Sequence, residues 1–207
     1  LSWTEAFDLY GSDKPDLRFD LKMQDAAFMA DLSDFVAFKA GAANADSSLP
    51  RHKRSGLKAL VVKNVADKYS RKMIEALESK AKLYKAKGLA WMKVASTGSA
   101  TTDIAFEGGI SKFYAGKEAE ICEKLGAEKN DLLLFVSDEN WQTACVAMGA
   151  VRSQLGKDLN LYNKEDEFHF VWIIDFPYFA FNEEENHWET EHHMFTLPQK
   201  QYWDTLE

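Results

Sequence analysis

The sequence predicts a mixed α/β domain of about 130 residues, followed by a C-terminal segment of a different kind, built around a β-hairpin. Short apolar runs of strand length alternate along the first part of the chain with segments of helical periodicity. The helical segments begin near Ser, Lys or Asn and are followed by Gly, the residue typical of helix ends. After residue 168 the chain continues as strand-like runs joined by a polar turn.

Four helices are predicted from capping residues and periodicity. With the glycine that ends each, they are residues 2–10 with Gly11, 70–87 with Gly88, 117–125 with Gly126 and 140–155 with Gly156. The spacing of Ser2 and Glu5 is that of a capping box. In the second helix the apolar face is expected to hold Met73, Leu77, Ala81 and Tyr84.

Six strands are predicted from apolar runs and alternation. They are residues 19–23, 35–38, 57–62, 89–94, 132–136 and 168–175. Residues 96–109 are expected to connect two strands of a hairpin. A second hairpin is expected where residues 178–181 and 187–189 flank an acidic turn at 182–186. The polar stretch 163–166 marks the expected boundary between the two parts of the chain.

The composition excludes several classes of protein. With 25 Lys and Arg against 33 Asp and Glu, the formal net charge is −8, whereas proteins that bind nucleic acid over their whole surface are basic. An acidic protein can still hold RNA through a local patch. A hydrophobic fraction of 46% excludes a disordered chain. No apolar run approaches the roughly 20 residues that cross a bilayer, and residues 1–5 do not resemble a signal peptide.

Two cysteines, Cys122 and Cys145, lie in predicted helices and form neither a CxxC pair nor a zinc spacing. We expect two buried thiols in a reducing cytoplasm. The chain also lacks the glycine-rich motifs of Rossmann and P-loop proteins and the GxSxG motif of hydrolases.

The adjacent histidines His192 and His193 are the most suggestive polar feature of the C-terminal segment. With Glu189 and Glu191 beside them, they could ligate a metal. Neighbouring side chains on a strand point to opposite faces, however. That geometry favours one inward-facing donor and one packed or solvent-facing ring.

Asp175 ends an apolar strand-like run and is followed by Phe176 and Pro177. A polar group in this position faces a ligand or caps a turn, and the proline favours the turn. The acidic run 183–185 is expected to be a solvated hairpin turn.

One dense basic cluster, residues 51–54, stands out in this acidic chain. Arg51, Lys53 and Arg54 could contact the phosphates of a nucleic acid. The alternative is the solvated tip of a hairpin, which the polar loop around the cluster favours.

Four segments resemble segments of bacterial-type aspartyl-tRNA synthetases, a class II family, and occur in the family order. They are Tyr10–Phe19 (YGSDKPDLRF), Ala86–Val94 (AKGLAWMKV), Phe170–Pro177 (FVWIIDFP) and Glu191–Thr196 (EHHMFT). The family has AKGLAWIKV, FLWVVDFP and HHPFT at the last three. Because the four segments span nearly the whole chain, the set is specific to this family.

The resemblance implies an α+β fold. A GAD-type mixed α/β insertion module, residues 27–163, is expected between short pieces of a class II synthetase catalytic domain with an antiparallel sheet, residues 1–26 and 164–207. The strand predicted at 168–175 would belong to that catalytic sheet. The two flanks should lie side by side, with the GAD module projecting from them.

The resemblance also implies a function for the parent enzyme. It would be a cytoplasmic, homodimeric ligase that activates aspartate with ATP and Mg²⁺ and transfers it to tRNA, without a membrane. His192 and His193 would then lie in the aspartate and ATP pocket, and Arg51, Lys53 and Arg54 are candidates for contact with tRNA. At Met194 the family usually has Pro, so the backbone after His193 is less restricted here.

The chain itself is expected to be inactive, monomeric and free of bound cofactor or metal, with no catalytic residue of its own. Class II synthetases use arginines in two motifs to bind the phosphates of ATP, and neither motif is present. The five arginines of the chain are Arg18, Arg51, Arg54, Arg71 and Arg152. Two alternatives remain open: a non-catalytic GAD module that binds tRNA or protein, and the GAD-containing subunit of a tRNA-dependent amidotransferase.

Overall fold

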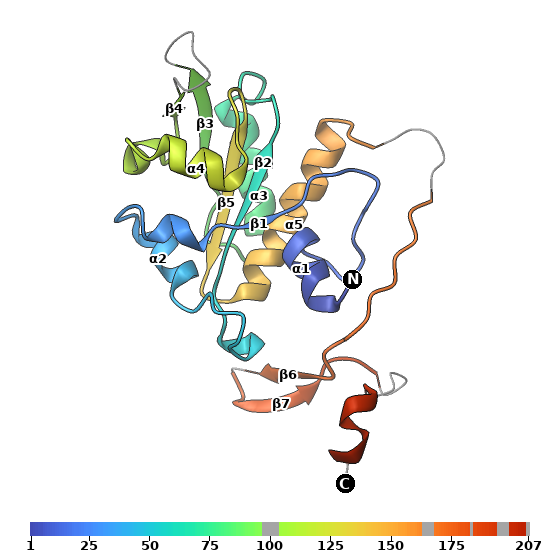
Figure 1. Cartoon of the computed structure of the whole chain (residues 1–207). Helices are drawn as coiled ribbons and strands as arrows, with labels where there is room; N and C mark the ends of the chain where they lie inside the picture. The colour runs from blue at the N-terminus through green and yellow to red at the C-terminus, as the bar shows by residue number, and fades with distance from the viewer. Residues whose placement is uncertain (97–103, 163–167, 183, 194–198, 206–207) are drawn as a thin grey trace.

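The computed structural model of the chain describes residues 1–96, 104–162, 168–182, 184–193 and 199–205. At its centre is a five-stranded sheet with strand order β1-β2-β5-β3-β4, in which every pairing is antiparallel (Figure 1). The strands are β1 (Gln24–Asp25), β2 (Gly56–Val62), β3 (Ala90–Ser96), β4 (Ile104–Glu107) and β5 (Leu132–Asp138). Three predicted strands are thus confirmed. β3 and β4 form a hairpin, but β4 lies within the stretch 96–109 that the sequence predicts as a connection. Residues 97–103 lie outside the described residues.

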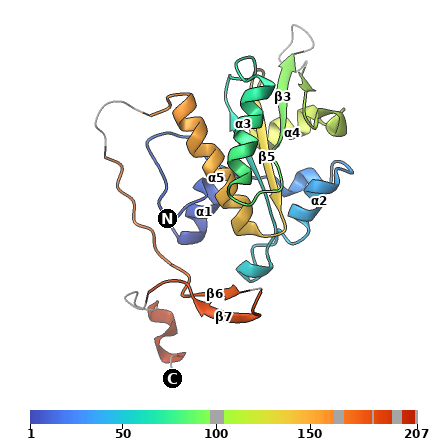
Figure 2. The ribbon, with the colours of Figure 1, turned by 180° about the vertical axis from the view of Figure 1, so that it is seen from behind.

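Helices cover both faces of this sheet (Figures 1 and 2). One face packs against α1 (Trp3–Tyr10), α3 (Arg71–Lys82) and α5 (Trp141–Asp158). The other packs against α2 (Val36–Ala42) and α4 (Glu118–Leu125). The short 3₁₀ helices η1 (Ala27–Ala30), η2 (Arg51–Lys53), η3 (Ser111–Tyr114) and η4 (Lys200–Thr205) complete the described elements.

The two central strands are buried on both faces. Leu60 on β2 and Leu134 on β5 contribute to the core beneath α3 and α5. Their neighbours Ala59 and Leu133 contribute to the core beneath α2 and α4. Successive strand residues face opposite sides of a sheet, so a strand with helices on both sides is apolar along most of its length. This explains the apolar runs of the sequence, which the buried Lys58 interrupts in β2.

The helix starts follow from local hydrogen bonds. Ser2 and Glu5 form the predicted capping box of α1, and Gly11 ends that helix in the left-handed conformation. The side chain of Ser70 accepts from the backbone N–H of Met73 at the start of α3, and that of Asn140 from Thr143 at the start of α5. These positions confirm the predicted starts, as Gly126 confirms the end of α4.

Two helices end elsewhere than predicted. α3 stops at Lys82 rather than Lys87, and its buried residues are Ile74, Leu77 and Ala81. Met73 and Tyr84, expected on the buried face, are exposed. α5 passes through Gly156 to Asp158. A Cβ at Gly156 would lie 2.6 Å from the ring of Phe19, so this glycine serves close packing and not helix termination.

The strand predicted at residues 19–23 is wrong. Its alternation is real, because Phe19, Leu21 and Met23 are buried. However, the guanidinium of Arg152 on α5 donates to the carbonyls of Phe19 and Leu21. A side chain thus satisfies backbone groups that a neighbouring strand would otherwise bind.

The strand predicted at residues 35–38 is also wrong, because the segment forms the start of α2. Phe35 and Phe38 are three residues apart, a spacing that places both on one side of a helix. Their rings contact each other with centroids 5.0 Å apart. A short apolar run does not distinguish the two structures.

The segment 168–175 is extended but is not the core strand that we expect. Phe168, Phe170 and Trp172 are 83%, 91% and 87% exposed. Ile174 forms a single parallel bridge with Ser2, and the N-terminal ammonium group donates to the carbonyl of Trp172. Residues 1–2 and 172–174 therefore lie side by side, without a surrounding sheet among the described residues.

The second predicted hairpin is confirmed. β6 (Phe179–Asn182) pairs with β7 (His187–Thr190) in antiparallel register. The side-chain oxygen of Asn182 accepts from the backbone N–H groups of Glu184 and Glu185, which folds the acidic turn. The expected domain boundary at 163–166 lies outside the described residues. α1 shares a core with α3 and α5, so the N-terminal flank packs as part of the central domain.

Candidate functional site

His192 is held on three sides after the end of β7. Its Nδ1 lies 2.6 Å from the carbonyl oxygen of Pro177. Because a carbonyl only accepts, Nδ1 carries the proton, and Nε2 of the neutral ring is left as an acceptor. The ring also meets Phe176 and Trp3 edge-on, with centroids 5.0 and 6.5 Å away.

His193 is exposed, whereas His192 is half-buried. The pair therefore has the arrangement expected of adjacent residues, with one ring packed inward and the other toward solvent. Within the described ranges, no group of three or more His, Cys, Asp or Glu side chains is placed to hold a metal ion. The structure thus gives the metal interpretation of this pair no support.

Arg51 does not extend into solvent as the tip of a hairpin would. Its guanidinium forms an ion pair with both carboxylate oxygens of Glu191 and donates to the carbonyl of Phe179, 3.2 Å away. It also stacks over the ring of Trp3, 4.7 Å from the centroid. The side chains of Arg51 and Glu191 are only 21% and 20% exposed.

The other members of the basic cluster differ in their surroundings. His52 packs against Phe181 and Trp188, with ring centroids 4.7 and 5.1 Å apart. Arg54 donates from Nε to the carbonyl of Leu49, 2.6 Å away. Lys53 is exposed. The structure therefore brings Arg51 and His52 to the β6–β7 hairpin and leaves Lys53 at the surface.

Trp3 joins the basic cluster to the histidine pair. Its indole stacks on Phe7 at 4.0 Å, lies beneath Arg51 and meets His192. Sequence reasoning missed Trp3, and it placed His52 in the basic cluster without assigning it a role. The ion pair of Arg51 and Glu191 spans 140 positions, and no periodicity links residues so far apart.

Asp175 has the left-handed backbone conformation, with φ of 58°, which suits the predicted turn. Its carboxylate accepts from the side chain of Gln199. This hydrogen bond joins the segment beside Ser2 to a residue 24 positions further along the chain.

Both thiols are buried, as predicted. Burial raises the pKa of Cys122 to about 11 and raises that of Cys145 further. At neutral pH both are protonated, so neither is a ready nucleophile.

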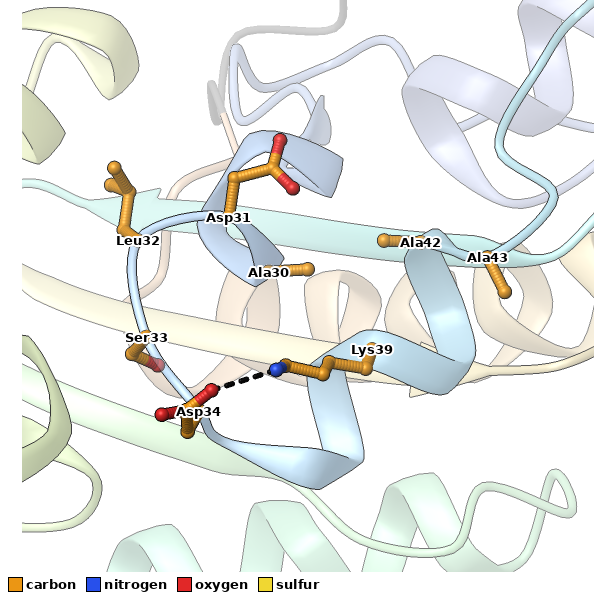
Figure 3. Close-up of a pocket in the computed structure, with 8 residues that line it drawn as sticks. All are labelled: Ala30, Asp31, Leu32, Ser33, Asp34, Lys39, Ala42 and Ala43. Carbon is orange, nitrogen blue, oxygen red and sulfur yellow. Dashed lines mark hydrogen bonds and ion pairs between the residues drawn. The ribbon is translucent and has the colours of Figure 1, made fainter.

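A separate surface hollow lies between η1 and α2 (Figure 3). Asp34 and Lys39 face each other across it, with Nζ 2.8 Å from Oδ1. The rest of its lining is mainly small or apolar: Ala30, Leu32, Ala42 and Ala43, with Ser33 and Asp31 at the edge. The two charges neutralise each other and both are exposed, so this hollow offers no arrangement for catalysis.

Part of the chain matches a known protein family. The sequence model of the GAD domain family matches residues 51–148. This part of the chain is similar to GAD domains, and residues 51–148 are called the GAD domain for that match. They run from η2 into α5 and include the basic cluster as well as β2, β3 and β5.

The chain as a whole is similar to aspartate–tRNA ligases. Over all 207 residues it is 56% identical to the Aspartate–tRNA(Asp/Asn) ligase of Treponema denticola and 45% identical to that of Treponema pallidum. It is 40% identical to the Aspartate–tRNA ligase of Streptococcus equi subsp. zooepidemicus. In each case the chain spans 32% of the relative's length. The resemblance to bacterial-type aspartyl-tRNA synthetases is confirmed, with a GAD domain inside the matched segment.

No helix in the described parts of the chain is both long and apolar enough to cross a membrane.

Proposed function

We propose that the chain is part of an aspartate–tRNA ligase, which activates aspartate with ATP and transfers it to tRNA. The observation that carries this proposal is the 56% identity over every residue of the chain to a ligase of that name. In the proposed division, residues 27–163 form the GAD insertion module, and residues 1–26 and 164–207 belong to the catalytic domain. The enzyme would act in the cytoplasm as a homodimer.

The exposed row Phe168, Phe170 and Trp172 supports a larger catalytic sheet. An extended segment with three aromatic side chains in solvent is unusual for a stable surface. Another strand of a catalytic domain, beyond this chain, would cover these side chains and pair with their backbone. Segment 168–175 is therefore proposed as a strand of that sheet in the whole enzyme.

His192 and His193 are proposed to line the aspartate and ATP pocket. A protonated imidazole, or the N–H of a neutral one, donates to a carboxylate or phosphate oxygen. The carbonyl of Pro177 fixes the proton of His192 on Nδ1, so a protonated ring would present Nε2–H to an anion. The packing of Phe176 and Trp3 fixes its orientation.

The chain alone is proposed to be inactive. Each of its five arginines has a partner: Arg18 binds Asp16, Arg51 binds Glu191, Arg54 binds the Leu49 carbonyl, Arg71 binds Glu75, and Arg152 binds backbone carbonyls. None lies in either of the two motifs whose arginines bind the phosphates of ATP in class II synthetases. Among the described residues, no group of three or more His, Cys, Asp or Glu side chains is placed to hold Mg²⁺.

Contact with tRNA is proposed for the basic cluster of Arg51, Lys53 and Arg54. Lys53 is the exposed member and is the best placed to meet a phosphate without breaking an existing contact. Replacing Lys53 with Ala should weaken tRNA binding and reduce its salt dependence by roughly one counterion. Unchanged affinity and salt slope would remove the cluster from the interface.

The proposal is tested by assaying aspartate-dependent pyrophosphate exchange in the full-length protein and in the 207-residue chain. We expect exchange in the former and none in the latter. His193→Ala in the full-length protein should raise the KM for aspartate, because it removes a donor from the pocket. Absence of exchange in the full-length protein would favour the alternatives, a binding GAD module or an amidotransferase subunit.

A further inference from the structure

Arg51 connects the GAD domain to both strands of the C-terminal hairpin. It binds the carbonyl of Phe179 at the start of β6 and the carboxylate of Glu191, the residue after β7. An arginine fork on a carboxylate is directional. Because both side chains are about four-fifths buried, solvent screens this pair less than an ordinary surface ion pair.

Glu191 transmits this restraint to the histidines. It directly precedes His192, and its backbone N–H donates to the carbonyl of Tyr178, 2.9 Å away. Holding both the side chain and the backbone of Glu191 fixes where the chain enters the histidine pair. The position of His192 therefore depends on a side chain of the GAD domain.

His52 provides a second contact between the same two parts. Its ring packs on Phe181 of β6 and Trp188 of β7. These two residues are directly opposite each other in the hairpin register, and their rings contact each other at 5.3 Å. One imidazole thus packs against a cross-strand aromatic pair, next to the Arg51 ion pair.

Trp3 provides a third link, because Arg51 and His192 contact the same indole. The guanidinium stacks over the ring while the imidazole meets it edge-on, 6.5 Å between centroids. Loss of the guanidinium would therefore also remove packing from the indole that orients His192.

We propose that Arg51, supported by His52, is a positioning residue that sets the affinity of the His192–His193 pocket for aspartate. This inference rests on the function proposed above for the two histidines. It gives the GAD domain a role in amino-acid activation that does not require tRNA. Arg51 acts through Glu191 and Trp3 and does not itself touch aspartate.

The experiment uses the full-length protein that contains this chain. The variants are Arg51→Met, Arg51→Lys and the charge-swapped double variant Arg51→Glu/Glu191→Arg. Arg71→Met is the matched control, because Arg71 also binds a glutamate of the GAD domain but is exposed and lies on α3. Pyrophosphate exchange is measured without tRNA, so that loss of a tRNA contact does not contribute. Hydrogen exchange of residues 178–193 is measured in parallel.

For Arg51→Met we expect the KM for aspartate to rise about tenfold, with kcat changed about twofold or less, since a mispositioned binding group weakens substrate binding. Arg51→Lys should give a KM for aspartate between those of the wild-type and Arg51→Met proteins. The double variant Arg51→Glu/Glu191→Arg, in which the two charges are swapped, should recover part of the affinity for aspartate. Amides of the hairpin should exchange faster in Arg51→Met than in Arg71→Met. Equal KM values in the Arg51→Met and Arg71→Met proteins would overturn the proposal.

The two readouts separate this inference from the proposed function. If the wild-type protein shows no aspartate-dependent exchange, the proposed function fails, and with it the role in affinity. Faster hydrogen exchange in Arg51→Met would then still show that Arg51 holds the hairpin. Unchanged hydrogen exchange overturns the positioning role whatever the activity.

Discussion

Lys58, in the middle of β2, donates from Nζ to Oδ1 of Asp8 on α1, 2.7 Å away. The same carboxylate oxygen accepts from the indole N–H of Trp141 at the start of α5, at 2.8 Å. The Lys58 side chain is only 4% exposed. One carboxylate therefore ties α1 to the sheet and to α5.

Asp8→Ala is expected to lower the free energy of unfolding by about 3 kcal/mol, because it leaves a buried ammonium without its closest partner. Asp25→Ala is the control, since Asp25 lies 3.7 Å from the same Nζ and is more exposed. It should cost less than about 1 kcal/mol. Urea unfolding of both variants measures the difference. Similar losses would mean that Asp8 is not the partner that stabilises Lys58.

Gly11→Ala is expected to destabilise the fold because α1 ends against the backbone of α5. A Cβ at Gly11 would lie 2.2 Å from the carbonyl oxygen of Cys145 and 2.7 Å from Cα of Gly149. Gly126 provides the matched control, since it has a similar positive φ but nothing within 4 Å of its added Cβ.

We expect Gly126→Ala to cost about 1 kcal/mol from backbone strain alone. Gly11→Ala should cost about 3 kcal/mol, the additional part coming from overpacking. Equal losses in chemical denaturation would show that α1 shifts without cost to admit a methyl group.

Arg152→Met should destabilise the chain by about 3 kcal/mol, because it removes the donor to the carbonyls of Asp16, Phe19 and Leu21. Methionine fills a similar volume, so lost hydrogen bonds dominate. Arg18→Met serves as the control, since Arg18 is exposed and bound to Asp16; its loss should be under about 1 kcal/mol. The free energy of unfolding of both variants is measured by thermal or urea unfolding. Equal losses in Arg152→Met and Arg18→Met would contradict this role of Arg152.

Stability is expected to fall at alkaline pH, in part through Cys122. Burial raises the pKa of its thiol from 9.0 to about 11, so the unfolded chain releases this proton first. The contribution of the protonated Cys122 thiol to the free energy of unfolding is intact below pH 9 and is lost as pH rises toward and through 11. Cys122→Ala should therefore show a shallower decline in the free energy of unfolding between pH 8 and 10.5. An identical slope in the variant would contradict the assignment.

The same burial predicts that neither thiol reacts in the native protein. At pH 8 we expect negligible labelling of Cys122 and Cys145 by a thiol reagent, and labelling of both in denaturant. Rapid labelling of the native protein would show that the helices carrying them open easily.

The resemblance to the synthetase family was visible in sequence because its motifs are contiguous segments. The candidate site was only half visible. His192 and His193 are adjacent in sequence and follow Glu191 directly, but Trp3 and Arg51 join them from two distant segments. Such a site depends on packing, which no local pattern encodes.

The sequence by itself determined where α1, α3 and α5 begin and that β2 and β5 are strands. Ser2, Ser70 and Asn140 cap their helices through hydrogen bonds that span three residues, and the apolar runs of β2 and β5 require cover on both faces. Only the tertiary structure decided the rest. The alternating segment 19–23 has the pattern of a strand, yet Arg152, more than 130 positions away, binds its carbonyls. The basic cluster has the pattern of a solvated loop, yet Glu191 and the hairpin bury Arg51. In both cases the local pattern was compatible with more than one structure. A side chain distant in sequence, Arg152 in the first case and Glu191 in the second, decided between them.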